Sequence, residues 1–130
     1  KILFPGDTLF ALGCGRLFEG TPQTLLHSLQ KIKNLPSDTR IYAAHEYTLQ
    51  NGRFAESIDP TNKALKERME KVRSQREQNV PTYPCTLEEE LATNPFLRTD
   101  QPAIIDAVNG SNLEEWEVFA RLRKRKDEFS

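Results

Sequence analysis

The spacing of the apolar residues changes near residue 59, and this change constrains the fold more than any other feature of the sequence. Before it, the apolar runs are short and end at turn residues, as strands do: residues 1–4, 8–12 and 40–44. After it, Leu65, Met69 and Val72 recur at helical spacing within a highly charged stretch. The sequence therefore predicts an α/β layer followed by an all-helical part.

A helix is expected between the second and third of these runs. Thr21 and Pro22 form an N-cap and first-turn pair, and apolar residues then repeat at positions 25, 29 and 32. Asn34-Leu35-Pro36 should end the helix. The order strand, helix, strand is what an α/β layer requires.

Three further helices are predicted after residue 79. Two of them should begin at capping boxes: Thr86 with Glu89, and Ser111 with Glu114. Between these lies a short helix over residues 102–108, with Asp100 as its expected cap and Asn109-Gly110 as its end.

The charge balance excludes some classes of function. The chain has 18 basic and 19 acidic side chains, with a net charge of -1, which argues against a general nucleic-acid binder. No apolar run approaches the roughly 20 residues that span a membrane, so no membrane association is expected. Basic residues do gather over 121–126, so we expect any anion site at that end.

Cysteine usage and the first residue bear on the setting of the chain. Cys14 and Cys85 make no disulfide framework, which favours a reduced, cytoplasmic location. The chain begins with Lys1 rather than Met and shows no leader, so we expect a further segment upstream.

Two segments have the residue types of a functional site. Asp7 stands at a strand bend, and Arg16 follows a turn predicted at Gly13-Cys14-Gly15. Asp is a hard oxygen ligand for a divalent metal, and Arg can pair with a carboxylate in a bidentate manner. Taken alone, however, an Asp after a glycine is most often a turn residue.

His45 follows the apolar run 40–44, at the end of a predicted strand. In α/β folds, functional side chains often lie at strand ends, and imidazole is a common metal ligand. An ordinary hydrogen-bonded histidine is the alternative. The other histidine, His27, is expected on the exposed side of a surface helix, and Cys14 is expected to be a small buried or turn residue rather than a nucleophile.

Several separated motifs stand together in an order and spacing that resemble glyoxalase II, the hydroxyacylglutathione hydrolases. They are Gly6-Asp7-Thr8-Leu9-Phe10, Gly13-Cys14-Gly15-Arg16, Phe18-Glu19-Gly20-Thr21, His45-Glu46-Tyr47-Thr48, Asn94-Pro95-Phe96-Leu97-Arg98 and Lys126-Asp127-Glu128-Phe129. The resemblance runs from the first residues nearly to the last.

The resemblance implies a fold of two parts. Residues 1–58 would be the C-terminal portion of a metallo-β-lactamase-type αββα sandwich, and residues 59–130 a helical substrate-binding domain. It also implies hydrolysis of the thioester S-D-lactoylglutathione to glutathione and D-lactate, at a centre of two divalent metals. Zinc is expected first, and iron or manganese would suit the same ligands.

The same resemblance implies roles for individual residues. Asp7 and His45 would be metal ligands, and no protein group beyond the metal ligands would be catalytic. The glutathione part would be held by Arg16, Phe18, Tyr47, Arg123 and Lys126, with Phe18 standing where some members of the family have Tyr.

The family's THxHxDH metal motif is absent from this sequence. We therefore expect this piece alone to hold its metals incompletely or not at all and to be inactive. It should need the missing N-terminal half or associate with itself. Two alternatives stay open: a non-catalytic anion- or protein-binding module, and another thioesterase or lactonase of the metallo-β-lactamase superfamily.

Overall fold

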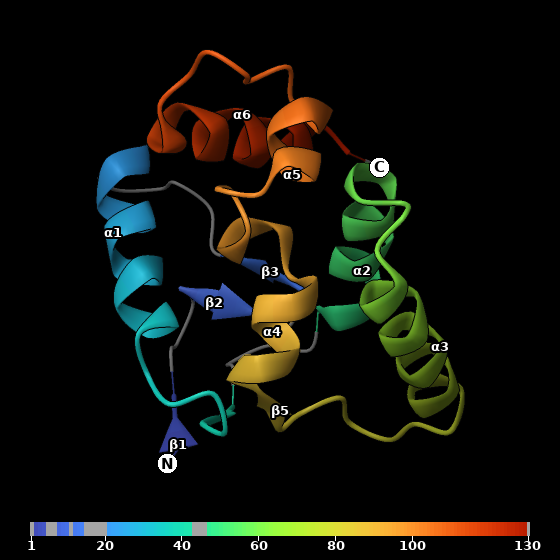
Figure 1. The fold of residues 1–130 in the computed structure, drawn as a ribbon. Coiled ribbons are helices and arrows are strands. Elements are labelled where there is room, and N and C mark those ends of the chain that lie inside the picture. The colour runs from blue at the N-terminus through green and yellow to red at the C-terminus, as the bar shows by residue number, and fades with distance from the viewer. Residues whose placement is uncertain (1, 5–7, 11, 15–20, 43–46, 130) are drawn as a thin grey trace.

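A computed structural model describes residues 2–4, 8–10, 12–14, 21–42 and 47–129. These residues form a mixed α/β fold in which helices surround two small sheets (Figure 1). The strands are β1 (Ile2–Leu3), β2 (Leu9–Phe10), β3 (Gly13–Cys14), β4 (Arg40–Ile41) and β5 (Cys85–Thr86). The helices are α1 (Pro22–Lys33), α2 (Thr48–Ile58), α3 (Lys63–Glu77), α4 (Leu87–Thr93), the 3-10 helix η1 (Pro95–Leu97), α5 (Pro102–Ala107) and α6 (Glu115–Glu128).

The strands form a three-stranded sheet and a hairpin. In the sheet, β4 lies between β1, to which it is parallel, and β5, to which it is antiparallel. The hairpin pairs β2 with β3, with Leu9 opposite Cys14 and Phe10 opposite Gly13. Because β5 joins the sheet, the part after residue 58 is helical except for this strand.

The predicted helix after Thr21 is confirmed as α1. The Thr21 side chain accepts from the Thr24 backbone N–H, Pro22 is the first helical residue, and Asn34 is the C-cap. Its buried face includes Leu29 and packs against α6, as the left and upper parts of Figure 1 show. His27 is exposed on this helix, as predicted.

Other predicted helices are confirmed with shifted ends. Helix α3 buries Leu65, Met69 and Val72, and the predicted capping box of Thr86 and Glu89 begins α4. Helix α5 ends as expected, because Asn109 takes a positive φ of 56° and the Gly110 N–H donates back to the Ile105 carbonyl.

Three local predictions were wrong. Ser111 does not begin α6, because residues 110–113 form a turn and Glu114 is the N-cap, in a capping box with Glu117. Asp100 does not cap α5, whose N-cap Gln101 makes no side-chain capping bond. Gly13 belongs to strand β3 rather than to a turn, and the positive φ of 62° falls on Leu12 instead.

Helix α2 was not predicted. Its buried positions include Phe54, Ala55 and Ile58, but Gly52 in its interior weakens any helical pattern in the sequence. A Cβ at position 52 would collide with the end of the Met69 side chain of α3, so a larger residue there would force that side chain to move. The glycine therefore allows α2 and α3 to pack closely.

Buried apolar residues connect both parts of the chain. One cluster joins Leu9 and Leu29 to Phe96, Phe119 and other residues of the later helices. Phe96 stacks near Phe54 and meets Phe119 edge to face. The boundary between residues 58 and 59 stays a prediction.

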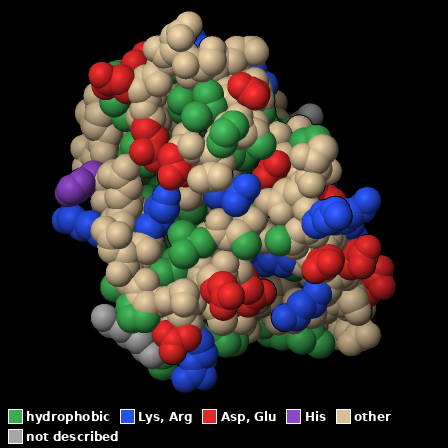
Figure 2. Space-filling model, in the orientation of Figure 1, with side chains coloured by type: hydrophobic (Ala, Val, Ile, Leu, Met, Phe, Trp, Pro, Cys, Tyr) green, Lys and Arg blue, Asp and Glu red, His purple; other side chains and the backbone are tan. Residues whose placement is uncertain are grey.

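The surface carries charges of both signs. Figure 2 shows acidic and basic side chains interspersed on one face, in keeping with the net charge of -1. Apolar side chains are exposed at β1, where Phe4 is 73% accessible and stacks on Tyr42 at 5.5 Å between ring centroids. None of the helices in the described part of the chain has the length and apolarity needed to cross a membrane.

Candidate functional site around the β2–β3 hairpin

Four of the predicted site residues lie outside the described residues: Asp7, Arg16, Phe18 and His45. Across the described ranges, no three His, Cys, Asp or Glu side chains gather in a way that could hold a metal ion. The assignment of Asp7 and His45 as ligands therefore stays a prediction. Tyr47, Arg123 and Lys126 are the predicted residues whose surroundings can be examined.

Tyr47 immediately precedes α2 and is 46% exposed. The next residue, Thr48, is buried, and its hydroxyl lies 2.6 Å from that of Thr82. The end of α2 that follows Tyr47 points away from α6 in Figure 1. A role of Tyr47 in substrate binding stays a prediction.

Arg123 is almost completely buried, with 3% of its surface exposed. Its Nη1 donates to the Cys14 carbonyl oxygen at 2.9 Å, and its Nε and Nη2 donate to Asp127 Oδ1 at 3.1 and 2.8 Å. The guanidinium also lies over the Phe96 ring, 5.3 Å from its centroid. These contacts join α6 to strand β3, and a role in substrate binding stays a prediction.

Lys126 lies half-buried in the last turn of α6, three residues after Arg123. Its neighbours in the basic run differ in their surroundings. Arg121, Lys124 and Arg125 are all exposed, and Arg121 also donates to the carbonyl oxygens of Val108 and Asn109, whereas Arg123 is buried. The run is therefore not a uniformly solvated helix end.

Side chains of the later helices bind three consecutive residues of the hairpin. The Leu12 N–H donates to the Glu90 carboxylate, 3.2 Å from each oxygen. Asn94 Nδ2 donates to the Gly13 carbonyl oxygen at 3.0 Å, and Arg123 donates to that of Cys14. Residues 12, 13 and 14 are therefore each fixed by a buried polar side chain.

Glu90 is at the centre of this buried network and is 0% exposed. Arg68 Nη2 lies 2.8 Å from Glu90 Oε1, and Asn94 Nδ2 donates to Oε2 at 2.8 Å. Burial disfavours the charged form of Arg68, but the neighbouring carboxylate outweighs it and raises the pKa of Arg68. The ion pair is therefore retained in the interior.

Neither cysteine forms a disulfide, both are buried, and neither has the surroundings of a nucleophile. Burial raises the pKa of the Cys14 thiol to about 12, although Arg123 opposes that effect. Burial also raises the pKa of Cys85, and the charge of Glu90 adds to the shift. The prediction that Cys14 is a buried residue is confirmed, and covalent thioester chemistry at Cys14 is disfavoured.

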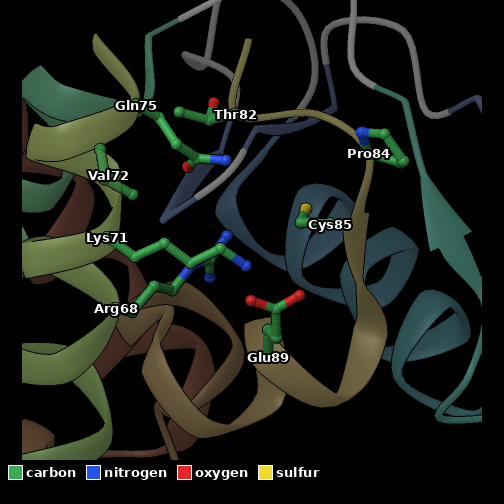
Figure 3. Close-up of a pocket in the computed structure, with 8 residues that line it drawn as sticks. All are labelled: Arg68, Lys71, Val72, Gln75, Thr82, Pro84, Cys85 and Glu89. Atoms are coloured by element: carbon green, nitrogen blue, oxygen red, sulfur yellow. The ribbon is translucent and has the colours of Figure 1, made fainter. Parts of the chain in front are cut away.

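A shallow pocket lies on the outer side of the same network. Figure 3 shows Arg68 and Lys71 reaching from α3 toward Glu89 on α4, with Cys85 drawn above Glu89. Its volume is about 290 Å³, part of it open to solvent. Among the predicted substrate residues that the structure describes, Tyr47, Arg123 and Lys126 do not line this pocket.

Glu90, Asn94 and Arg68 were not predicted to form one network. Asn94 was noted only as part of a motif shared with a family, and Glu90 and Arg68 were not predicted as site residues. The available signal was the pattern of Glu90 and Asn94, four residues apart and therefore on one helix face. Their partners lie too far away in the sequence to be inferred from spacing.

Comparison with known proteins identifies the family. The family model described as "Hydroxyacylglutathione hydrolase C-terminus" matches residues 46–129. Proteins named hydroxyacylglutathione hydrolase from Mesorhizobium japonicum and Chelativorans sp. are 54% and 55% identical to this chain, over 99% and 98% of its length. The one from Methylococcus capsulatus is 52% identical over 98%.

The matches cover 51%, 50% and 50% of these three relatives. The chain thus spans about half the length of the curated relatives it matches. With the family model matching most of its residues and about half of its positions identical to these relatives, the chain belongs to the hydroxyacylglutathione hydrolase C-terminal family.

Proposed function

We propose that this chain is the C-terminal half of a hydrolase that converts S-D-lactoylglutathione to glutathione and D-lactate. The observation that carries the proposal is the identity of 54% over 129 residues to a protein named hydroxyacylglutathione hydrolase. In this proposal, residues 1–58 complete a metallo-β-lactamase-type αββα sandwich together with the preceding half, and the cytoplasm is the site of action.

The chain would contribute part of a metal centre. A carboxylate and an imidazole suit zinc, iron and manganese, so Asp7 and His45 have the right donor chemistry, and the preceding half would supply the remaining ligands. When bound, two divalent metals supply Lewis-acid activation of water and of the thioester carbonyl. The chain alone would be inactive because two ligands leave such a centre incomplete.

The remaining residues would bind and orient the substrate. Arg16, Tyr47, Arg123 and Lys126 would hold the glutathione part, with the basic groups pairing to its glycine carboxylate, and Phe18 would pack against it. The half-buried position of Lys126 supports this role, because a partly desolvated ammonium pairs more strongly with a carboxylate than an exposed one does.

The experiment is a comparison of two thioesters with the full-length protein that carries this chain as its C-terminal half. With divalent metal present, kcat/KM for S-D-lactoylglutathione should exceed that for a D-lactoyl thioester of N-acetylcysteamine, which lacks the two carboxylates of glutathione. We expect a difference of about 100-fold or more, equivalent to two charge-assisted contacts. Equal values would favour another thioesterase, and hydrolysis of neither would favour a binding module.

A further inference from the structure

We propose that Glu90 and Asn94 are positioning residues for the hydrolase centre. From helix α4 and its C-cap, they fix the β2–β3 hairpin, which connects the predicted ligand Asp7 with the predicted substrate residue Arg16. The inference rests on the proposed function, because it requires that Asp7 and Arg16 serve the hydrolytic reaction.

The first argument is the pattern of contacts. Glu90 accepts from the Leu12 N–H, and Asn94 donates to the carbonyl oxygen of the next residue, Gly13. One contact holds a donor and the other an acceptor, on consecutive residues of the chain. Together they oppose both sliding and rotation of the strand, which one hydrogen bond does not do.

The second argument is that the two side chains are themselves held rigidly. Glu90 pairs with Arg68, which also donates to Thr93 Oγ1 at 2.8 Å. Asn94 Oδ1 accepts from the Phe96 N–H at 2.9 Å, so the residue also caps η1. Glu90 and Asn94 are both completely buried, which leaves their side chains few alternative rotamers.

The third argument concerns the register of the hairpin. Leu12 has a φ of 62°, a left-handed conformation that is unfavourable for a residue other than glycine and needs support from its surroundings. The contacts of Glu90 and Asn94 fall at this turn. With the turn fixed at residue 12, Leu9 pairs with Cys14 at the open end of the hairpin.

That open end is where the hairpin is joined to the predicted site. Asp7 comes two residues before Leu9, and Arg16 comes two residues after Cys14. If the hairpin register shifted by one residue, Asp7 and Arg16 would no longer each be two residues from a paired strand residue. Glu90 and Asn94 therefore fix the hairpin that lies between the predicted metal ligand Asp7 and the predicted substrate residue Arg16.

The test compares Asn94→Asp with Asn62→Asp in the full-length protein. Asn62 makes a similar set of hydrogen bonds but is only partly buried: its Oδ1 caps α3 through Leu65, and its Nδ2 donates to the Asp59 carboxylate and the Ala92 carbonyl oxygen. Both substitutions keep the cap, remove the donor and place two carboxylates together. Only Asn94 contacts the hairpin.

We expect Asn94→Asp to weaken zinc binding by about tenfold or more, as loss of a group supporting a metal ligand commonly does. The Leu12 amide should also exchange its hydrogen faster. The kcat should fall, and KM should rise because Arg16 follows strand β3 by two residues in the sequence. Asn62→Asp should remain within about twofold of wild type in zinc affinity, kcat and KM, with all measurements made where circular dichroism shows both variants folded.

An active wild type in which Asn94→Asp matches Asn62→Asp in zinc affinity and in Leu12 exchange would overturn the positioning role alone. An inactive wild type would overturn the proposed function, and the positioning role with it. If Asn94→Asp does not fold, Asn94→Ser and Asn62→Ser make the same comparison, because serine keeps a capping oxygen and adds no charge.

Discussion

Replacing Glu90 with glutamine should destabilise the fold far more than the same change at a surface ion pair. Glu90 accepts from Leu12 and Asn94 and pairs with Arg68 at 2.8 Å, in an environment without solvent exposure. Glutamine removes the charge and turns one acceptor into a donor. Arg68 would then be a buried cation without its carboxylate.

The magnitude follows from burial. Removing one partner of a buried ion pair costs about 3–5 kcal/mol, because the other charge stays desolvated and uncompensated. The matched control is Glu56→Gln. Glu56 pairs with Arg73 at 2.6 Å, but the two side chains are 32% and 47% exposed, and such pairs contribute about 0–1 kcal/mol.

Urea unfolding of the full-length protein, followed by circular dichroism at 222 nm, measures the difference. With a denaturant slope of about 2 kcal/mol per M, Glu90→Gln should lower the midpoint of the transition that includes these helices by roughly 1.5–2.5 M. Glu56→Gln should lower it by less than about 0.5 M. The two ion pairs have similar distances and differ mainly in burial. Equal shifts for the two variants would therefore refute the reasoning from burial.

Two further predictions concern Cys14 and Lys126. The raised pKa of Cys14, about 12 against an ordinary 9.0, means that the unfolded thiol ionises first, so the unfolding free energy should fall as pH rises from 9 toward 12. The unfolding free energy of the Cys14→Ala variant should fall less over that pH range. An equal fall in both proteins would contradict the raised pKa of Cys14. Lys126→Ala should raise KM for S-D-lactoylglutathione about tenfold with little change in kcat. The exposed control Lys124→Ala should change neither KM nor kcat. The same KM in both variants would remove Lys126 from the proposed site.

Local signals in the sequence predicted the elements that depend on local chemistry. Thr21 with Pro22 marked the start of α1, and the capping box of Thr86 and Glu89 marked the start of α4, because caps act within one helical turn. Helix α2 was not predicted because Gly52 interrupts its helical pattern. The reason for a small residue there is its contact with Met69 of α3, which a local sequence pattern does not show.

The buried network could not be predicted for a related reason. Glu90 meets Leu12 across 78 positions of the chain, and Asn94 meets Gly13 across 81. Such partners are chosen by tertiary packing, and the sequence offers only the residue types. The motifs around Asp7 and His45 indicated the family, whereas the contacts that hold the hairpin appeared only in the structure.

Whether this chain supplies part of the hydrolase centre is tested most directly by the Asp7→Asn substitution in the full-length protein. We expect this variant to lose bound metal and at least about 100-fold in kcat for S-D-lactoylglutathione, because the proposed metal ligand is removed. Asp38→Asn, at an exposed turn, should retain wild-type metal content and activity. Full metal content and full activity in Asp7→Asn would contradict the claim that this chain supplies part of the hydrolase centre.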